Sequence, residues 1–122
     1  MSCLNENMPL ILVVEDEALV RGCTAALLED AGCDVIEAAD AEEALWQFET
    51  HPRVTTLFTD INMPGPFNGL SLAHKIFQMR PQVQLILTSG RGSPSEAEMP
   101  VGGHFLPKPY DCDQLTALIR AA

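Results

Sequence analysis

The stretch Thr56-Leu57-Phe58-Thr59-Asp60-Ile61-Asn62-Met63-Pro64-Gly65 is an apolar run that ends in one carboxylate and is followed at once by a Met-Pro-Gly turn. A strand that delivers a single acid to its carboxyl end and then breaks is typical of the reactive edge of an open parallel sheet. Asp followed by Asn and Pro-Gly is also ordinary turn chemistry. The ends of the other strands decide between these two interpretations.

The composition indicates one folded, acidic domain. The chain has 122 residues, of which 47% are hydrophobic and 20% charged, and this composition is typical of a globular domain. Its formal net charge of −10 repels phosphate backbones and anionic lipid. We therefore expect it to bind neither nucleic acid nor membranes.

No signal peptide or transmembrane segment is visible, and the four cysteines lack metal or disulfide-scaffold spacing. Reduced thiols and a cytoplasmic location are the expectation. Residues 1–8 are predicted to be a loose polar leader, and residues 9–122 are predicted to form the domain.

Apolar runs and helical periodicity alternate along the chain. They predict strands at 10–14, 34–38, 54–60, 83–88 and 104–106, and helices at 18–31, 41–51, 69–80 and 111–120. In the first helix, one apolar side is expected from Leu19, Cys23, Ala26, Leu27 and Leu28. Gly32 is a candidate C′ residue, and Asp40 with Glu43 predicts a capping box. Residues 91–103 are rich in Pro and Gly and have room for only one short turn, around 95–98.

This alternation predicts an α/β fold, a doubly wound sheet of five parallel strands with helices on both faces. Ligands bind such sheets at the carboxyl ends of the strands. Polar side chains stand at four of these ends, namely Glu15 with Asp16, Asp60, Thr88 and Lys108. Their convergence on one pocket favours a functional Asp60 over a turn residue.

The chemistry of this set indicates phosphoryl transfer. Each close pair of carboxylates costs roughly 4 kcal/mol at about 4 Å and an effective dielectric of about 20, so a cation beyond Lys108 is needed. Oxygen ligands without clustered His or Cys favour Mg²⁺. Asp60 is then the nucleophile, whose product is an aspartyl phosphate, while Thr88 and Lys108 hold phosphoryl oxygens.

Four motifs in order carry a family resemblance, and they read LILVVEDE, FTDINMPG, LTSG and FLPKPY. With them the chain resembles, over about residues 9–121, the receiver domain of two-component response regulators, of the single-domain or hybrid-kinase type. The resemblance implies a flavodoxin-like sheet with strand order 2-1-3-4-5. It also implies a phosphorylation-dependent signalling switch in a phosphorelay. Asp60 would accept a phosphoryl group from a phosphohistidine of a sensor histidine kinase or histidine phosphotransfer protein, as an acceptor and not as a turnover enzyme.

The same resemblance implies further roles. Asp16 and Asp60 would bind Mg²⁺ directly, Glu15 through water, and Asn62 through its backbone carbonyl. Thr88 and Phe105 would be switch residues, with core packing as the alternative for Phe105. The Lys108-Pro109 peptide bond would be cis.

The chain also departs from the family pattern. Glu15 stands where Asp is commoner, the loop 65–69 looks one residue longer, and the fourth helix is short or absent across 91–103. The usual output and homodimer surface includes that helix, so a homodimer stays possible without support from the pattern. Arg91 either contacts phosphate or is a solvated loop arginine, and the second interpretation is favoured.

Competing functions are distinguished by single positions. A haloacid-dehalogenase-like phosphatase needs a carboxylate where Asn62 stands, and a flavodoxin-like cofactor binder needs a phosphate-cradling loop where Glu15, Asp16 and Glu17 would repel phosphate. A receiver-like scaffold that binds a partner without phosphorylation stays open, as does a fragment of a hybrid histidine kinase.

Overall fold

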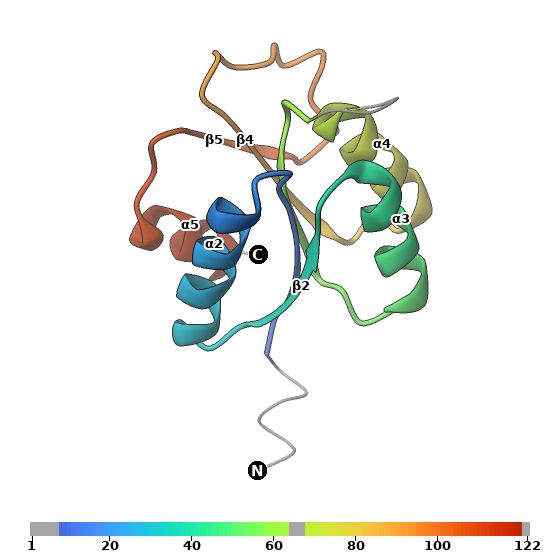
Figure 1. The fold of residues 1–122 in the computed structure, drawn as a ribbon. Coiled ribbons are helices and arrows are strands. Elements are labelled where there is room, and N and C mark those ends of the chain that lie inside the picture. The colour runs from blue at the N-terminus through green and yellow to red at the C-terminus, as the bar shows by residue number, and fades with distance from the viewer. Residues whose placement is uncertain (1–7, 64–67, 121–122) are drawn as a thin grey trace.

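The computed structural model describes residues 8–63 and 68–120. Strands and helices alternate along the chain (Figure 1). The strands are β1 (Leu10–Val14), β2 (Asp34–Ala38), β3 (Thr56–Asp60), β4 (Gln84–Ser89) and β5 (His104–Pro107). The helices are α2 (Ala18–Asp30), α3 (Ala41–Thr50), α4 (Gly69–Met79) and α5 (Cys112–Arg120). Seven residues of the predicted leader and most of the predicted longer loop at 65–69 lie outside the described ranges.

The sheet has the order β2-β1-β3-β4-β5, and every neighbouring pair is parallel. This confirms the predicted doubly wound fold. The order changes direction at β1, so the ends of β1 and β3 flank the point where ligands bind in such sheets. The register places Asp60 directly opposite Thr88 on β4. The two predicted site residues therefore meet at one edge of the sheet.

Helices cover both faces of the sheet, as Figure 1 shows, with α2 and α5 on one side and α3 and α4 on the other. Each face has its own core. Leu12, Leu57 and Leu85 point to the α3/α4 side, and Ile11, Val13 and Ile86 point to the α2/α5 side. The strands are buried on both faces, which explains their nearly unbroken apolar sequence.

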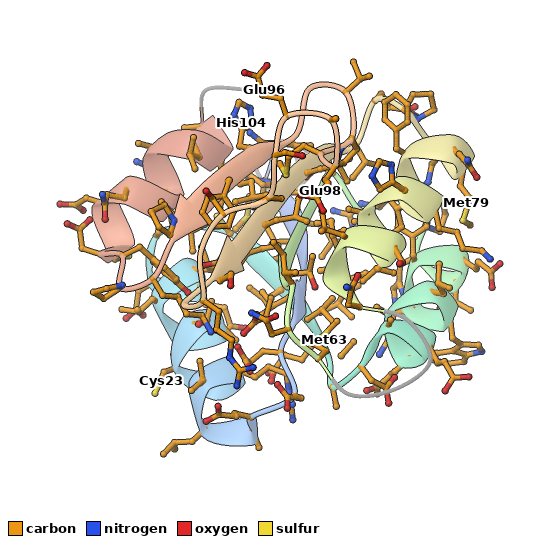
Figure 2. The ribbon with its side chains drawn as sticks, turned by 90° about the horizontal axis from the view of Figure 1, so that it is seen from above. Cys23, Met63, Met79, Glu96, Glu98 and His104 are labelled. Atoms are coloured by element: carbon orange, nitrogen blue, oxygen red, sulfur yellow. The ribbon has the colours of Figure 1, made fainter. Side chains whose placement is uncertain are left out.

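The predicted inner side of α2 is wrong in part. Thr24, Ala25 and Leu28 are buried, whereas Leu19 is 81% and Leu27 47% exposed. Figure 2 shows Cys23 pointing outward from the same helix. Apolar residues occur almost all round α2, so periodicity alone does not reveal the side that meets the sheet. The contact uses Thr24, Ala25 and Leu28 and leaves a second apolar stripe uncovered.

Local signals at the helix ends agree with the predictions. Gly32 has φ of +95°, as a C′ residue requires, and the Cys33 N–H donates to the Leu28 carbonyl at 3.0 Å. Asp40 accepts from the Glu43 N–H at 2.8 Å. The Glu43 carboxylate reaches back to the N–H of Ala39, one residue before the expected cap.

No helix forms between β4 and β5, where all residues from 91 to 103 are described. One turn occurs at Ser95–Glu98, closed by the Glu98 N–H donating to the Ser95 carbonyl at 3.0 Å, as predicted. His74 on α4 donates through Nε2 to the Glu98 carbonyl at 2.6 Å. Figure 2 shows Glu96 and Glu98 on this connection. A hydrogen-bonded loop thus stands in place of the fourth helix of the family pattern, as the sequence predicts.

Candidate functional site

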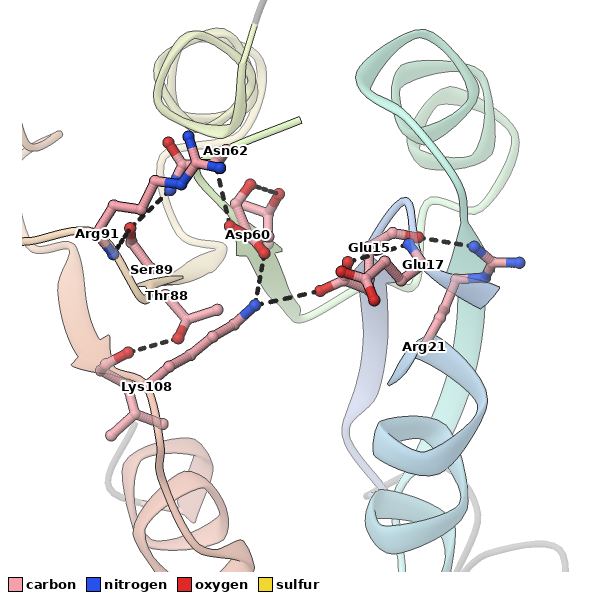
Figure 3. A network of polar contacts seen from close by, with 11 residues as sticks. Glu15, Glu17, Arg21, Asp60, Asn62, Thr88, Ser89, Arg91 and Lys108 are labelled. Carbon is pink, nitrogen blue, oxygen red and sulfur yellow. Dashed lines mark hydrogen bonds and ion pairs between the residues drawn. The ribbon is translucent and has the colours of Figure 1, made fainter. Parts of the chain in front are cut away.

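Asp60 ends β3 with only 7% of its surface exposed. Its Oδ1 accepts from the backbone N–H of Asn62 at 2.9 Å, and its Oδ2 accepts from the Lys108 ammonium at 2.6 Å (Figure 3). The burial follows from the position at the tip of a central strand. Both oxygens are held, so the carboxylate has a fixed orientation toward the edge of the sheet.

Lys108 lies just after β5 and bridges two acids. Its Nζ lies 2.6 Å from Asp60 Oδ2 and 3.5 Å from Glu15 Oε1. Burial alone would lower the pKa of Lys108, but the hydrogen bond and charge of Asp60, helped by Glu15, more than offset it and raise that pKa. The ammonium is therefore charged at neutral pH. The Lys108-Pro109 bond is cis, as the family resemblance implies.

Glu15 follows β1 and is 6% exposed. Burial raises its pKa, with Asp16 and Asp60 adding to the effect, while the Glu17 N–H and the Lys108 charge act against it. Arg21 donates to the Glu15 backbone carbonyl at 2.7 Å and so supports this loop. The charged form of Glu15 is therefore disfavoured by burial even with the Lys108 ammonium 3.5 Å away.

Asp16 is exposed, and it lines a cavity of about 390 Å³ together with Asp60 and Lys108. Among the described residues, no three Asp, Glu, His or Cys side chains are grouped as a ready-made metal site. The donor set nevertheless fits Mg²⁺, which takes one or two carboxylates and keeps several waters. Asp16 and Asp60 supply such oxygens, with Glu15 behind them. A role for the Asn62 carbonyl stays a prediction.

Thr88 and Phe105 lie beside the site without facing Asp60. The Thr88 side chain is buried, and its hydroxyl donates to the Leu106 carbonyl on β5 at 2.6 Å. Phe105 is half-buried, packs against the α3/α4 core and lines a small cavity that Lys108 also lines. The sequence therefore places Thr88 at the correct strand end, whereas its present partner belongs to the neighbouring strand.

Two site features were not predicted from the sequence. The first is a hydrogen-bonded cluster in which Ser89 Oγ accepts from Asn62 Nδ2 at 2.7 Å and from the Arg91 N–H at 3.0 Å. This cluster connects the segment after β3 to the segment after β4. The only sequence signal was the position of Ser89 and Arg91 just after Thr88.

The second unpredicted feature is the close approach of α4 to the end of β3. The Gly69 N–H donates to the Ile61 carbonyl at 3.0 Å. A Cβ on Gly69 would lie 2.2 Å from the Asp60 carbonyl oxygen. The absence of a side chain at Gly69 therefore lets the helix begin directly against the backbone of the acidic residue.

Together these groups form an acidic cavity with one buried, oriented carboxylate and a bridging ammonium. With a divalent cation held by its carboxylates, such a site would neutralise an incoming anionic group while presenting a carboxylate oxygen as nucleophile. Residues 8–63 and 68–120 contain no helix long and apolar enough to cross a membrane.

Comparison with known proteins agrees with this architecture. Residues 11–120 match the family described as "Response regulator receiver domain". The chain is 33% identical over 116 residues to the nitrogen assimilation regulatory protein NtrX of Azorhizobium caulinodans, covering 92% of this chain and 25% of that protein. It is 32% identical over 117 residues to the aerobic respiration control protein ArcA of Escherichia coli, covering 92% of this chain and 47% of ArcA. The chain thus spans between a quarter and half of these relatives.

Solved structures extend the likeness to three dimensions. The receiver domain of the hybrid histidine kinase CckA superposes with a TM-score of 0.78 at 35% identity, covering 92% of this chain and 96% of that one. A response regulator receiver protein from Pseudomonas putida gives a TM-score of 0.83 at 33% identity, covering 94% and 98%. The chain therefore belongs to the response regulator receiver domain family.

Proposed function

We propose that this chain is a phosphorylation-dependent switch in which Asp60 accepts a phosphoryl group from a phosphohistidine. The observation that carries the proposal is the buried Asp60 carboxylate, held at 2.6 Å by Lys108 in a cavity that Asp16 also lines. It acts as a stoichiometric acceptor and not as a turnover enzyme.

In the proposed step an Asp60 carboxylate oxygen attacks phosphorus, and the phosphorus–nitrogen bond of the phosphohistidine breaks. The electron pair of that bond leaves with the imidazole of the donor, and the product is an acyl phosphate. Asp16 and Asp60 would hold Mg²⁺, with Glu15 behind, and the metal would supply neutralisation of the phosphoryl charge. The Asn62 N–H and the Lys108 ammonium orient the attacking carboxylate.

The product changes the charge that the site must hold. Phosphorylation replaces one negative charge by nearly two and adds three acceptor oxygens. Lys108 can pair with one of these oxygens from its present position. Thr88 can donate to another only by leaving the Leu106 carbonyl, to which it is now bound. We infer that this exchange of partners carries the signal from Asp60 to β5 and Phe105.

An apolar groove beside the site favours a protein donor. Leu19, Cys23 and Leu27 on α2 face Tyr110 and Leu115 across a groove of about 760 Å³, which Gly90 and Lys108 also line. Since the groove and the acceptor cavity share Gly90 and Lys108, a partner seated in the groove would have its own side chains next to Asp60. The occupant that we propose is the histidine-bearing helix of a sensor kinase or phosphotransfer protein.

Phosphorylation is tested by incubating the protein with Mg²⁺ and acetyl phosphate or phosphoramidate and measuring its intact mass. The expected result is a gain of one phosphoryl group that is lost in Asp60→Ala. If no donor gives an adduct with the folded wild-type protein, the remaining candidate is a scaffold that binds its partner without phosphorylation.

Donor docking is tested separately with Leu19→Asp. This change is expected to slow transfer from phosphorylated histidine kinases or phosphotransfer proteins by at least about tenfold, since it charges an apolar contact surface. Phosphorylation by acetyl phosphate should stay at the wild-type rate. Trp46→Asp is the control, because Trp46 is also an exposed large apolar residue, at 62%, but lies on α3 across the sheet.

A further inference from the structure

Arg91 lies at the mouth of the acceptor cavity. It lines that cavity together with Asp60 and Lys108, and it also lines a neighbouring cavity with Asn62 and Asn68. Figure 3 shows its side chain running from the end of β4 toward Asn62, while Lys108 approaches Asp60 from the β5 side. Two cations of the chain therefore border one acidic cavity from different strands.

The backbone of Arg91 is fixed relative to the acceptor. Its N–H donates to Ser89 Oγ at 3.0 Å, and the same oxygen accepts from the Asn62 amide at 2.7 Å. The Asn62 N–H in turn holds Asp60 Oδ1 at 2.9 Å. Three consecutive hydrogen bonds thus connect the base of the Arg91 side chain to the nucleophilic carboxylate.

Three other arginines have hydrogen-bonded guanidinium groups, whereas the guanidinium of Arg91 is free to bind a ligand within the described residues. Arg21 is bound to Glu37 and the Glu15 carbonyl, Arg80 to carbonyls at the end of α3, and Arg120 to the Ala31 carbonyl. Within residues 8–63 and 68–120, the Arg91 side chain has no hydrogen bond or ion pair. It is a cation beside an acidic cavity without a tight carboxylate partner in that part of the chain.

We propose that Arg91 is a second cationic ligand of the phosphoryl group on Asp60, an inference that rests on the proposed function. The phosphoryl group presents three oxygens, and Lys108, as a point charge, holds one of them. A guanidinium donates two parallel hydrogen bonds to phosphate and suits an oxygen that projects into the open mouth. Arg91 would thus bind the group from the side opposite Lys108 and close the mouth over it.

The test uses beryllofluoride, an anion that mimics the phosphoryl group on a carboxylate, at saturating Mg²⁺. Its affinity is measured by ¹⁹F NMR titration for wild type, Arg91→Ala, Arg91→Lys and Arg53→Ala. Loss of one charge-assisted contact in a partly open site should weaken beryllofluoride binding about tenfold in Arg91→Ala. Arg91→Lys should recover part of the affinity, because it keeps the charge and loses the fork.

Arg53→Ala is the matched control, because Arg53 is exposed just before β3, at the opposite edge of the sheet, and its removal changes the net charge equally. It should bind beryllofluoride as wild type does. Urea midpoints of the Arg91 variants should equal that of wild type. Equal beryllofluoride affinity in Arg91→Ala and wild type would overturn the inference, even if Mg²⁺ bound more tightly because loss of the arginine makes the site more negative. If the wild type itself bound no beryllofluoride, both this inference and the proposed function would be contradicted.

Discussion

Gly69→Ala is expected to destabilise the domain and also to displace Asp60, the proposed phosphoryl acceptor. An added Cβ would lie 2.2 Å from the Asp60 carbonyl oxygen and 2.9 Å from both the Asp60 carbonyl carbon and the Ile61 Cα. Since non-bonded heavy atoms prefer about 3.5 Å, the start of α4 and the end of β3 must separate by about 1 Å. All three clashing atoms belong to the backbone, so no side-chain rotation relieves the overlap.

The magnitude follows from two opposing effects. Overpacking in a rigid site costs about 1–3 kcal/mol, with backbone displacement at the upper end, and alanine returns up to about 1 kcal/mol of helix propensity. A net loss of about 2 kcal/mol is expected, which corresponds to a fall in melting temperature on the order of 10 °C for a domain of this size. Urea unfolding followed by circular dichroism measures the loss.

Gly22→Ala is the matched control for Gly69→Ala. A Cβ at Gly22 would meet no atom within 4 Å, and the residue lies inside α2. Alanine there should stabilise the domain by up to about 1 kcal/mol. In Gly69→Ala the phosphorylation yield should also fall, because the clash displaces Asp60. A Gly69→Ala protein as stable as wild type, with unchanged phosphorylation, would refute the argument from close approach.

Three further substitutions test individual contacts. Glu15→Gln should raise the urea midpoint at pH 7, because burial raises the pKa of Glu15 and its charged form therefore lowers stability. This gain in stability should vanish as the pH falls through the raised pKa, since wild-type Glu15 is then protonated. Asp40→Ala removes the side-chain cap of α3 and should cost about 1 kcal/mol in urea unfolding. Arg80→Ala should cost about 1–3 kcal/mol, since the guanidinium lies 3.8 Å over the Phe48 ring and donates to three carbonyls at the end of α3; an unchanged thermal midpoint would contradict this.

Much of the fold could be predicted because the local signals agree with the tertiary structure. The unbroken apolar runs at β1 and β3 are required by a sheet covered on both faces, and the bounds of β1 and β2 agree with the prediction. β3 begins at Thr56 and not at Val54, since the Val54 N–H bonds to the preceding turn at His51 and not to a neighbouring strand.

For the site too, the features set by topology could be predicted, whereas those set by individual tertiary contacts could not. Parallel topology alone brings Asp60, Thr88 and Lys108 to one edge, so their positions after three apolar runs were sufficient to predict the set. The direction of the Thr88 hydroxyl depends on a rotamer and on the adjacent Leu106 carbonyl, and no local pattern encodes it. The hydrogen-bonded cluster at Ser89 and the contact of Gly69 with Asp60 join segments distant in sequence, so only their three-dimensional placement reveals them.

The proposed function requires that Asp60, and no other residue, carries the phosphoryl group. After reaction with acetyl phosphate and Mg²⁺, borohydride converts an aspartyl phosphate to homoserine, and peptide fragmentation by mass spectrometry locates the modified residue. We expect homoserine at position 60 and unmodified Glu15 and Asp16. Modification of Asp16, phosphate on His74, or an unmodified peptide at Asp60 in a phosphorylated protein would contradict it.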